Sequence, residues 1–259
     1  HTRRQRQMCI RDSGKAFNRI DGMWVRRWKG NTIKSRCCGR GFLDKQRKKV
    51  SRHSSTASRL SHRLSCCLGM LNDLELHSFD ISTAFLRGLR FADIKRAAKD
   101  LGVELEVNRK VWMIPPANVW RHLRNNSYSN IRIGDNDIEK YILLLLKALY
   151  GLVDGPLLFQ LGLILFMTKE MGLVASIHDT NFLYYTTDWK LQCIVLVYVD
   201  DLLVWATAKF TEWINTMLES RFGKLKRSKP PFTFIGVVHD LITKDHLHLH
   251  QRPYLDKLR

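Results

Sequence analysis

Residues 193–206 have the sequence CIVLVYVDDLLVWA, in which Asp200 and Asp201 stand between two apolar runs. Seven apolar residues, Cys193–Val199, precede the acids, and Leu202–Ala206 follow them. Short Val-rich runs on both sides of such a break predict a buried β-hairpin with the acids at its tip. An Asp-Asp pair alone is most often a solvated turn, because Asp tolerates the backbone angles of a hairpin. Here buried strands would carry two carboxylates to one point, which is unfavourable unless a cation meets them there.

A third carboxylate, Asp80, lies between the apolar residues Phe79 and Ile81. This alternation predicts a strand with Asp80 on the face opposite to its two neighbours. Mg²⁺ prefers carboxylate oxygens, and two-metal phosphoryl transfer needs a carboxylate from a second element. Asp80, Asp200 and Asp201 are therefore candidate catalytic and metal-binding residues. A solvent-facing strand aspartate is the alternative interpretation of Asp80.

The chain of 259 residues is strongly basic, with a formal net charge of +19. Residues 1–63 contain 19 basic and three acidic side chains, which accounts for +16 of that charge. This predicts a polyanionic partner, because clustered Lys and Arg release counterions from phosphates. For residues 1–30 a disordered basic tail is an equal alternative to a nucleic-acid-contacting segment. Residues 1–13, HTRRQRQMCIRDS, look like a translated sequencing adapter and are excluded from fold reasoning.

The remaining composition is typical of a soluble globular protein, with 45% hydrophobic residues. No apolar run reaches the roughly 18–20 residues of a membrane span, so no membrane partner is expected. The pairs Cys37–Cys38 and Cys66–Cys67 lack the C-x₂-C spacing of a zinc motif, which favours free buried thiols. His246, His248 and His250 would share one face of a strand, where solvent exposure is favoured over zinc binding.

Hydrophobic periodicity predicts a mixture of helices and strands. Residues 14–65 are expected to be irregular with short strands, Asn125–Asp137 to be a loop, and Ile138–Leu149 to be a strand or a helix. Helices are predicted over Leu60–Leu76, Phe91–Gly102, Leu157–Met171 and Thr211–Phe222. Further strands are predicted over His77–Ile81, Leu105–Pro116, Phe232–Val238 and Leu247–Leu249.

Several motifs resemble those of copia-type retrotransposon reverse transcriptases. Tyr198–Asp201 matches the family's YVDD box, and HSFDISTAFLRG at 77–88 is similar to its first catalytic motif. The other resembling stretches are LKALYGLVDGP at 146–156, DTNFL at 179–183, FIGVV at 234–238 and HQRPYLDKL at 250–258. With Ile33–Phe42 as a degenerate first element, the ordered set spans residues 33 to 259. Each match alone is modest, whereas the ordered set is specific.

The resemblance implies an α+β fold, a right-hand polymerase whose palm contains a ferredoxin-like sheet. It implies the fingers in two segments, 31–73 and 91–150, and the palm in two, 74–90 with the first catalytic Asp and 151–240 with the YVDD hairpin and primer grip. Residues 241–259 would begin a connection or thumb, most of which is missing. Ribonuclease H, integrase and protease sequences are also missing, so we expect a fragment of a larger polyprotein.

The resemblance also implies roles for individual residues. Asp80 and Asp200 would bridge two Mg²⁺ ions, with Mn²⁺ as an alternative, and Asp201 would complete the site. Phe85 would be the steric gate against a ribose 2′-OH. The other implied nucleotide-binding residues are Thr83, Ala84, Tyr150, Gly151, Lys34, Arg36 and Arg40. The implied primer grip consists of Phe234, Ile235, Gly236 and Val237.

The implied activity is RNA-directed DNA polymerisation, transferring a nucleotide from a dNTP to a primer 3′-OH on an RNA or DNA template. The implied location is a cytoplasmic virus-like particle or the nucleus. Val153-Asp154 replaces the family's Lys-Gln, which loses a cation and places an anion near the phosphates. A catalytically decayed nucleic-acid-binding remnant is therefore the alternative. A different metal-dependent nucleotidyltransferase or nuclease, using the same acids without primer extension, is a further rival. Phe85 and the primer-grip motif argue against it, because a nuclease needs neither.

Overall fold

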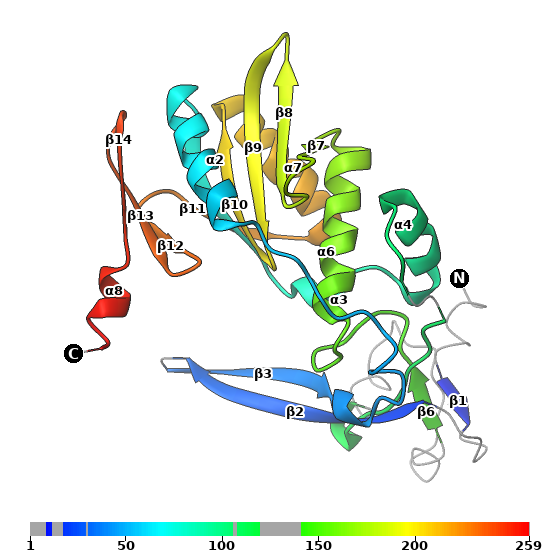
Figure 1. Cartoon of the computed structure of the whole chain (residues 1–259). Coiled ribbons are helices and arrows are strands. Elements are labelled where there is room, and N and C mark those ends of the chain that lie inside the picture. Colours follow the sequence, from blue (N-terminus) through cyan, green and yellow to red (C-terminus); the bar gives the residue numbers. More distant parts are fainter. Residues whose placement is uncertain (1–8, 12–17, 30, 106–107, 120–140, 259) are drawn as a thin grey trace. The chain divides into compact units, whose positions relative to one another are not determined.

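The chain has a mixed α+β fold with three sheets in the computed structural model (Figure 1). It divides into two discontinuous compact units. Unit 1 contains His1–His53 and Phe85–Gly162, and unit 2 contains Ser54–Ala84 and Leu163–Arg259. The structure describes residues 9–11, 18–29, 31–105, 108–119 and 141–258.

A six-stranded antiparallel sheet forms the centre of unit 2, in the order β11-β4-β10-β9-β8-β7. Its central strands β9 and β10 are almost wholly apolar and are buried on both faces. Helices α2 and α7 lie on opposite faces of this sheet (Figure 1). The strands are β4 (Glu75–Ile81), β7 (Val174–Ala175), β8 (Phe182–Thr187), β9 (Lys190–Tyr198), β10 (Asp201–Ala206) and β11 (Leu225–Ser228). The helices are α2 (Arg59–Leu71), the π-helical turn η4 (Phe166–Glu170) and α7 (Ala208–Phe222).

A second, three-stranded antiparallel sheet of unit 2 has the order β12-β13-β14. Phe234 at the end of β12 is only 2% exposed and belongs to the apolar cluster that contains Trp205 of β10. This sheet is therefore attached to the core of unit 2 through Phe234. Its elements are β12 (Phe232–Phe234), β13 (Val237–Thr243) and β14 (His246–His250), followed by the exposed helix α8 (Arg252–Leu255).

Unit 1 contains a five-stranded sheet in the order β1-β6-β5-β2-β3. Long strands β2 and β3 form a hairpin, so the prediction of short strands in residues 14–65 was wrong. A basic tail was one prediction for residues 1–30, but Arg19–Lys29 of that segment form the strand β2. Residues 1–8 and 12–17 of the segment lie outside the described residues. The strands are β1 (Cys9–Arg11), β2 (Arg19–Lys29), β3 (Thr32–Gly39), β5 (Trp112–Ile114) and β6 (Tyr141–Leu144).

The short helices of unit 1 are η1 (Gly41–Leu43), η2 (Phe91–Asp93) and α4 (Ile94–Leu101). Gly102, in the left-handed conformation, ends α4 and confirms the helix predicted there. Helices α3 (Ala84–Arg87) and α6 (Gly155–Leu165) each cross a boundary between the units. The loop predicted over Asn125–Asp137 lies outside the described residues. No helix in the described part of the chain is long and apolar enough to span a membrane.

Helix α2 confirms the helix predicted from Leu60, but it ends at Leu71, and its leucines contribute little to the core. Leu60 and Leu71 are 76% and 80% exposed, whereas the small residue Gly69 is buried. A Cβ atom on Gly69 would lie 2.2 Å from Cδ2 of Trp205. The large indole of β10 therefore requires a small residue on the buried face of α2. Leu60, Leu64 and Leu71 are exposed, and Leu68 packs partly buried against the core.

Candidate active site

The hairpin predicted around the two acids is present. Tyr198 of β9 pairs with Asp201 of β10, so Val199 and Asp200 form a two-residue loop. Val199 has φ of +59°, a left-handed conformation that is strained for a β-branched residue. A positive φ at the first loop position matches a type II′ turn, where Gly is the usual residue. The buried strands on either side hold the turn in this strained conformation. The turn in turn fixes Asp200 at the tip of the hairpin.

Strand β4 brings the third aspartate to this tip. Asp80 pairs directly with Asp201 in the antiparallel register of β4 and β10. Directly opposed residues project from the same face of a sheet, with Cβ atoms about 4.5–5.5 Å apart. Phe79 and Ile81 are 0% and 1% exposed, whereas Asp80 is partly exposed, as the alternation predicted. Asp80 and Asp201 therefore lie side by side at one end of the neighbouring strands β4 and β10.

The three carboxylates repel one another. Burial, followed by the charges of Asp200 and Asp80, raises the pKa of Asp201 from 3.8 to about 6. Accumulated negative charge of this kind is relieved by a divalent cation, and a donor set made only of carboxylate oxygens suits Mg²⁺. By donor chemistry and electrostatics, the residues fit the ion that the sequence predicts.

The three aspartates do not form a group whose ligand atoms all lie within 4.8 Å of one another, as far as the described residues extend. A pair of ions about 3.5–4 Å apart does not require such a group, because each ion needs only some of the carboxylates. The assignment of Asp80, Asp200 and Asp201 as metal ligands stays a prediction.

A lysine on the neighbouring strand was missed as a specific candidate. Lys226 of β11 pairs with Asp80 in the register of β11 and β4, on the side opposite to Asp201. It lies in the basic stretch 224–229, KLKRSK, whose composition indicates only a solvated surface or general contact with nucleic acid. Composition gives no strand register, so the sequence contained no signal that placed this cation beside Asp80.

Three of the predicted nucleotide-binding residues lie together in unit 1. The guanidinium of Arg36 lies over the ring of Tyr150, 5.2 Å from its centroid. The rings of Phe85 and Tyr150 have centroids 5.7 Å apart. Arg36 is exposed and the two aromatic rings are partly exposed, so the group offers one cation and two apolar surfaces.

The turn after Tyr150 is tightly packed on the end of β3. Gly39 donates its amide to the carbonyl of Tyr150 at 2.7 Å. Gly151 has φ of +95°, and a Cβ atom there would lie 2.1 Å from the carbonyl oxygen of Gly39. Only Gly fits this position, which gives a structural reason for the Tyr-Gly pair and locates it beside the predicted finger strand.

The remaining predicted nucleotide-binding residues are not brought into one group. Lys34 is exposed on β3, and Arg40 lies 3.7 Å from Asp21 in a partly exposed ion pair. Thr83 and Ala84 belong to unit 2; Thr83 is exposed with φ of +59°, and Ala84 is 3% exposed. Their assignment stays a prediction.

Asp154, which the resemblance places near the phosphates, is buried and paired with a cation. Asp154 is 3% exposed, and Arg109 donates from Nε to its carboxylate at 2.7 Å. Arg109 also donates to Asp44 at 2.6 Å, so one buried guanidinium joins two buried carboxylates. Burial alone would raise the pKa of Asp44, but hydrogen bonds from Arg109 and Asn18 outweigh it and hold the pKa below its ordinary value. Asp154 is thus a structural partner within unit 1.

The predicted primer grip is the turn between β12 and β13. Phe234 pairs with Val237, and the two loop residues, Ile235 and Gly236, have φ of +46° and +80°. Positive φ at both positions is typical of a type I′ turn, in which Ile is a strained residue. Phe234 is buried in the core of unit 2, which leaves Ile235, Gly236 and Val237 as the residues available for contact.

No protein-family model matches the chain, and no curated protein matches it. Among solved structures it is similar to telomerase from Candida albicans in complex with a fragment of telomeric RNA, with a TM-score of 0.49 and 11% identity over 96% of this chain and 48% of that chain. Two apo telomerase structures from Candida tropicalis give TM-scores of 0.47 and 0.48 at 10% and 12% identity, again over 96% of this chain. The chain spans 48–58% of the length of these telomerase structures.

Proposed function

We propose that the chain is the polymerase core of a reverse transcriptase, which transfers a nucleotide from a dNTP to a primer 3′-OH. The observation that carries the proposal is the pairing of Asp80 with Asp201 next to Asp200 on the strained hairpin tip. A raised pKa of about 6 for Asp201 supports a site designed to meet a cation. The copia-type origin is proposed from the ordered motifs alone.

Asp80, Asp200 and Asp201 would hold two Mg²⁺ ions, or Mn²⁺ in their place. When bound, such ions lower the pKa of the primer hydroxyl and neutralise charge on the leaving pyrophosphate. The protein's own part is positioning. Rigid strands β4, β9 and β10 fix the three carboxylates, and Lys226 supplies a permanent positive charge beside Asp80.

The group of Arg36, Tyr150 and Phe85 suits a nucleotide. A guanidinium binds phosphate oxygens, and aromatic rings pack against a sugar or a base. Phe85 would exclude a ribose 2′-OH by its size, so deoxynucleotides would be preferred. Basic residues on the β2–β3 hairpin, including Arg26, Arg27, Lys34 and Arg36, would bind the template-primer backbone without strong sequence preference.

The rival proposal, a decayed remnant that binds nucleic acid without catalysis, loses one of its supports. It depended partly on a damaged neighbourhood at Val153-Asp154, but the carboxylate of Asp154 is paired with Arg109, which it shares with Asp44. We further propose that the active protein works within a larger polyprotein, together with ribonuclease H and integrase, in a cytoplasmic virus-like particle or in the nucleus.

Primer extension tests the proposal. We expect the purified chain to extend oligo(dT) on poly(rA) with dTTP and Mg²⁺, and Asp200→Asn to abolish extension. Asp188→Asn is the matched control, because Asp188 is an exposed turn aspartate with positive φ in the neighbouring β8–β9 hairpin of the same sheet. Template binding without extension by the folded wild-type chain would support the remnant instead.

A further inference from the structure

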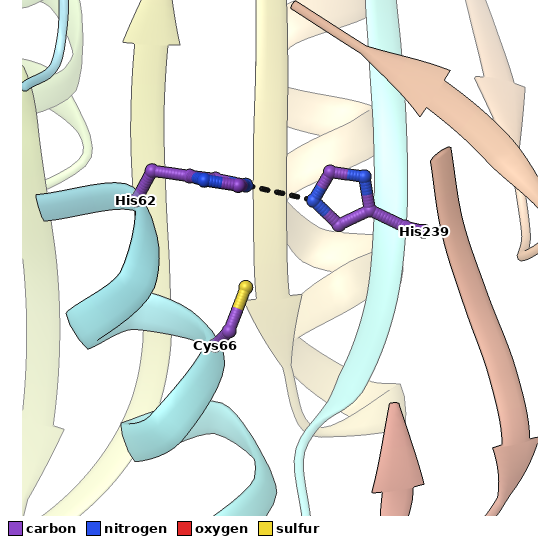
Figure 2. A group of neighbouring side chains, drawn as sticks. All are labelled: His62, Cys66 and His239. Carbon is purple, nitrogen blue, oxygen red and sulfur yellow. Dashed lines mark hydrogen bonds between the residues drawn. The ribbon is translucent and has the colours of Figure 1, made fainter. Parts of the chain in front are cut away.

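Three buried side chains of unit 2 bring two imidazoles and a thiol together. His62 and Cys66 are four residues apart on α2 and therefore project from the same side of the helix. His239 comes from β13 and points toward them (Figure 2). Their ligand atoms all lie within 4.8 Å of one another, and the residues are 6%, 6% and 0% exposed. None of the three belongs to the candidate active site.

We infer that His62, Cys66 and His239 form a binding site for a thiophilic d¹⁰ cation, for which Zn²⁺ is the best fit. Imidazole nitrogen and cysteine sulfur are the ligands that zinc prefers. Mg²⁺ and Ca²⁺ require oxygen ligands, and this group offers none. The site is therefore distinct in chemistry from the three aspartates, and its occupancy does not depend on the proposed polymerase activity.

A hydrogen bond to a backbone carbonyl prepares His239 for this role. Its Nδ1 lies 3.1 Å from the carbonyl oxygen of Val237, which requires the proton to be on Nδ1. The lone pair of Nε2 then faces His62, whose Nε2 lies at 2.8 Å. A backbone carbonyl that orients the far side of the ring is the usual partner of a metal-binding histidine.

Only small movements separate this arrangement from a coordinated one. With Zn–N bonds of about 2.0–2.1 Å in tetrahedral geometry, the two nitrogens would be about 3.3 Å apart. The rings would therefore separate by about half an ångström. In a zinc site the sulfur of Cys66 would lie about 3.5 Å from each nitrogen. The sulfur now lies within 4.8 Å of both nitrogens, so each of these distances would shorten by little more than an ångström at most.

Proton balance is simple. Burial lowers the pKa of His62, and burial followed by the charge of His62 lowers that of His239 to about 4, so both rings are neutral at pH 7. Burial raises the pKa of the Cys66 thiol to about 12, so the free thiol is protonated. On binding, Cys66 releases its proton to solvent and forms the Zn–S bond, while the proton on His62 moves from Nε2 to Nδ1. One proton leaves for each ion that binds.

The ordinary explanation of the cluster is a hydrogen-bonded histidine pair that happens to lie near a core cysteine. That explanation assigns no role to the sulfur, so Cys66 distinguishes the two. The exposed thiol of Cys67, next to Cys66 on the same helix, provides a matched control. His248 of β14, whose ring lies 4.9 Å from that of His250, provides a control for binding by other histidines.

A bound ion would join α2 to the β12–β13 hairpin, between residues 177 positions apart in the chain. The ring of Phe234 lies 6.1 Å from that of His62 and 6.2 Å from that of His239. Occupancy would therefore hold the turn formed by Ile235 and Gly236 against the core. Hydrogen exchange of the amides in residues 232–243 should slow when the ion binds.

The test uses the full chain without a histidine tag, stripped with a chelator and then titrated with Zn²⁺ against a chromophoric chelator. We expect one Zn²⁺ per chain for the wild type, Cys67→Ser and His248→Gln. Affinity should fall about 100-fold or more in Cys66→Ser and His239→Gln, because losing a ligand costs at least as much as losing a group that only orients a ligand. Wild-type affinity no higher than that of Cys66→Ser, or loss of binding in either control, would overturn the inference.

Cobalt substitution tests the sulfur ligand directly in the wild-type chain, so the result does not depend on whether a variant folds. Co²⁺ bound to the wild type should produce a thiolate-to-cobalt charge-transfer band, which persists in Cys67→Ser and is missing in Cys66→Ser. A wild-type chain without this band overturns the inference, whatever the variants do. Slower exchange in residues 232–243 on addition of Zn²⁺ supports it, and unchanged exchange there counts against it.

Discussion

Asp201→Asn should stabilise the protein while it destroys the proposed activity. The pKa of Asp201 is raised from 3.8 to about 6, because its folded environment disfavours the charged form. At about 1.36 kcal/mol for each pKa unit, that shift corresponds to a penalty of about 3 kcal/mol above pH 6. Asp201 is partly exposed to solvent, which screens its charge, so we expect about 1.5 kcal/mol. The asparagine keeps the size of the side chain and removes the penalty.

The sign of the effect defines a pH window. Because the folded pKa is higher than the unfolded one, the carboxyl destabilises the fold as pH rises from 3.8 to 6, and the full penalty persists above 6. The advantage of Asp201→Asn should therefore be largest at pH 7.5 and fall to about a third of that value at pH 4.5. Saturating Mg²⁺ should also reduce the difference, because the ion stabilises only the charged wild-type site.

Hydrogen exchange of peptides from β10 measures the change in local stability in the sheet of unit 2. A gain of about 1.5 kcal/mol corresponds to exchange about tenfold slower than in the wild type, measured with EDTA at pH 7.5. Asp245→Asn, at an exposed turn, is the control and should change stability by less than about 0.5 kcal/mol. Equal or faster exchange in Asp201→Asn would refute the reasoning. A difference in exchange rate that changes with neither pH nor Mg²⁺ would show that charge repulsion is not its source.

Two further variants test unit 1. Arg109→Met should destabilise it by about 3–5 kcal/mol in chemical denaturation, because Asp44 and Asp154 would stay buried without their cation. Adding Asp44→Asn and Asp154→Asn should recover part of the loss, whereas Arg96→Met, at a side chain 78% exposed, should change little. Phe85→Val should reduce the preference for dNTP over rNTP, measured as the ratio of kcat/KM values, by about tenfold to 100-fold. Phe42→Val, an exposed aromatic in the same unit, should leave that ratio unchanged, and an unchanged ratio in Phe85→Val would remove the steric-gate assignment.

Local patterns predicted the hairpin of the candidate site and the orientation of Asp80, because both are encoded locally. The Val-rich runs around Asp200 and Asp201 specify a buried hairpin, and the alternation of Phe79, Asp80 and Ile81 specifies which way Asp80 points. The pairing of Asp80 with Asp201 is different, because the pattern of one strand does not specify its partner. That juxtaposition was expected only through the resemblance of ordered motifs, and Lys226, which no motif marked, was missed.

Elements that depend on distant partners were predicted less well. Helix α2 was predicted, but its sequence does not show that the Trp205 indole on another strand requires a small residue, Gly69, on its buried face. Asp154 looked like a misplaced anion until Arg109, 45 positions away, was located beside it. His62, Cys66 and His239 show no metal-ligand spacing, because four residues separate two of them and 173 separate the third. In each case the deciding contact is absent from the local sequence.

Backbone strain bears on whether the proposed site is intact. Among the described residues, the β-branched residues with positive φ are Thr83, Val199 and Ile235. Each costs roughly 1–2 kcal/mol relative to an ordinary conformation, and glycine would relieve it. All three lie in turns that carry predicted site residues, after Asp80, at the YVDD tip and in the predicted primer grip. Positive φ is not confined to these turns, because Asp73, Asp188 and Trp189 also have it. At the three motif turns, however, a strained β-branched residue is expected where the surrounding strands impose the backbone geometry.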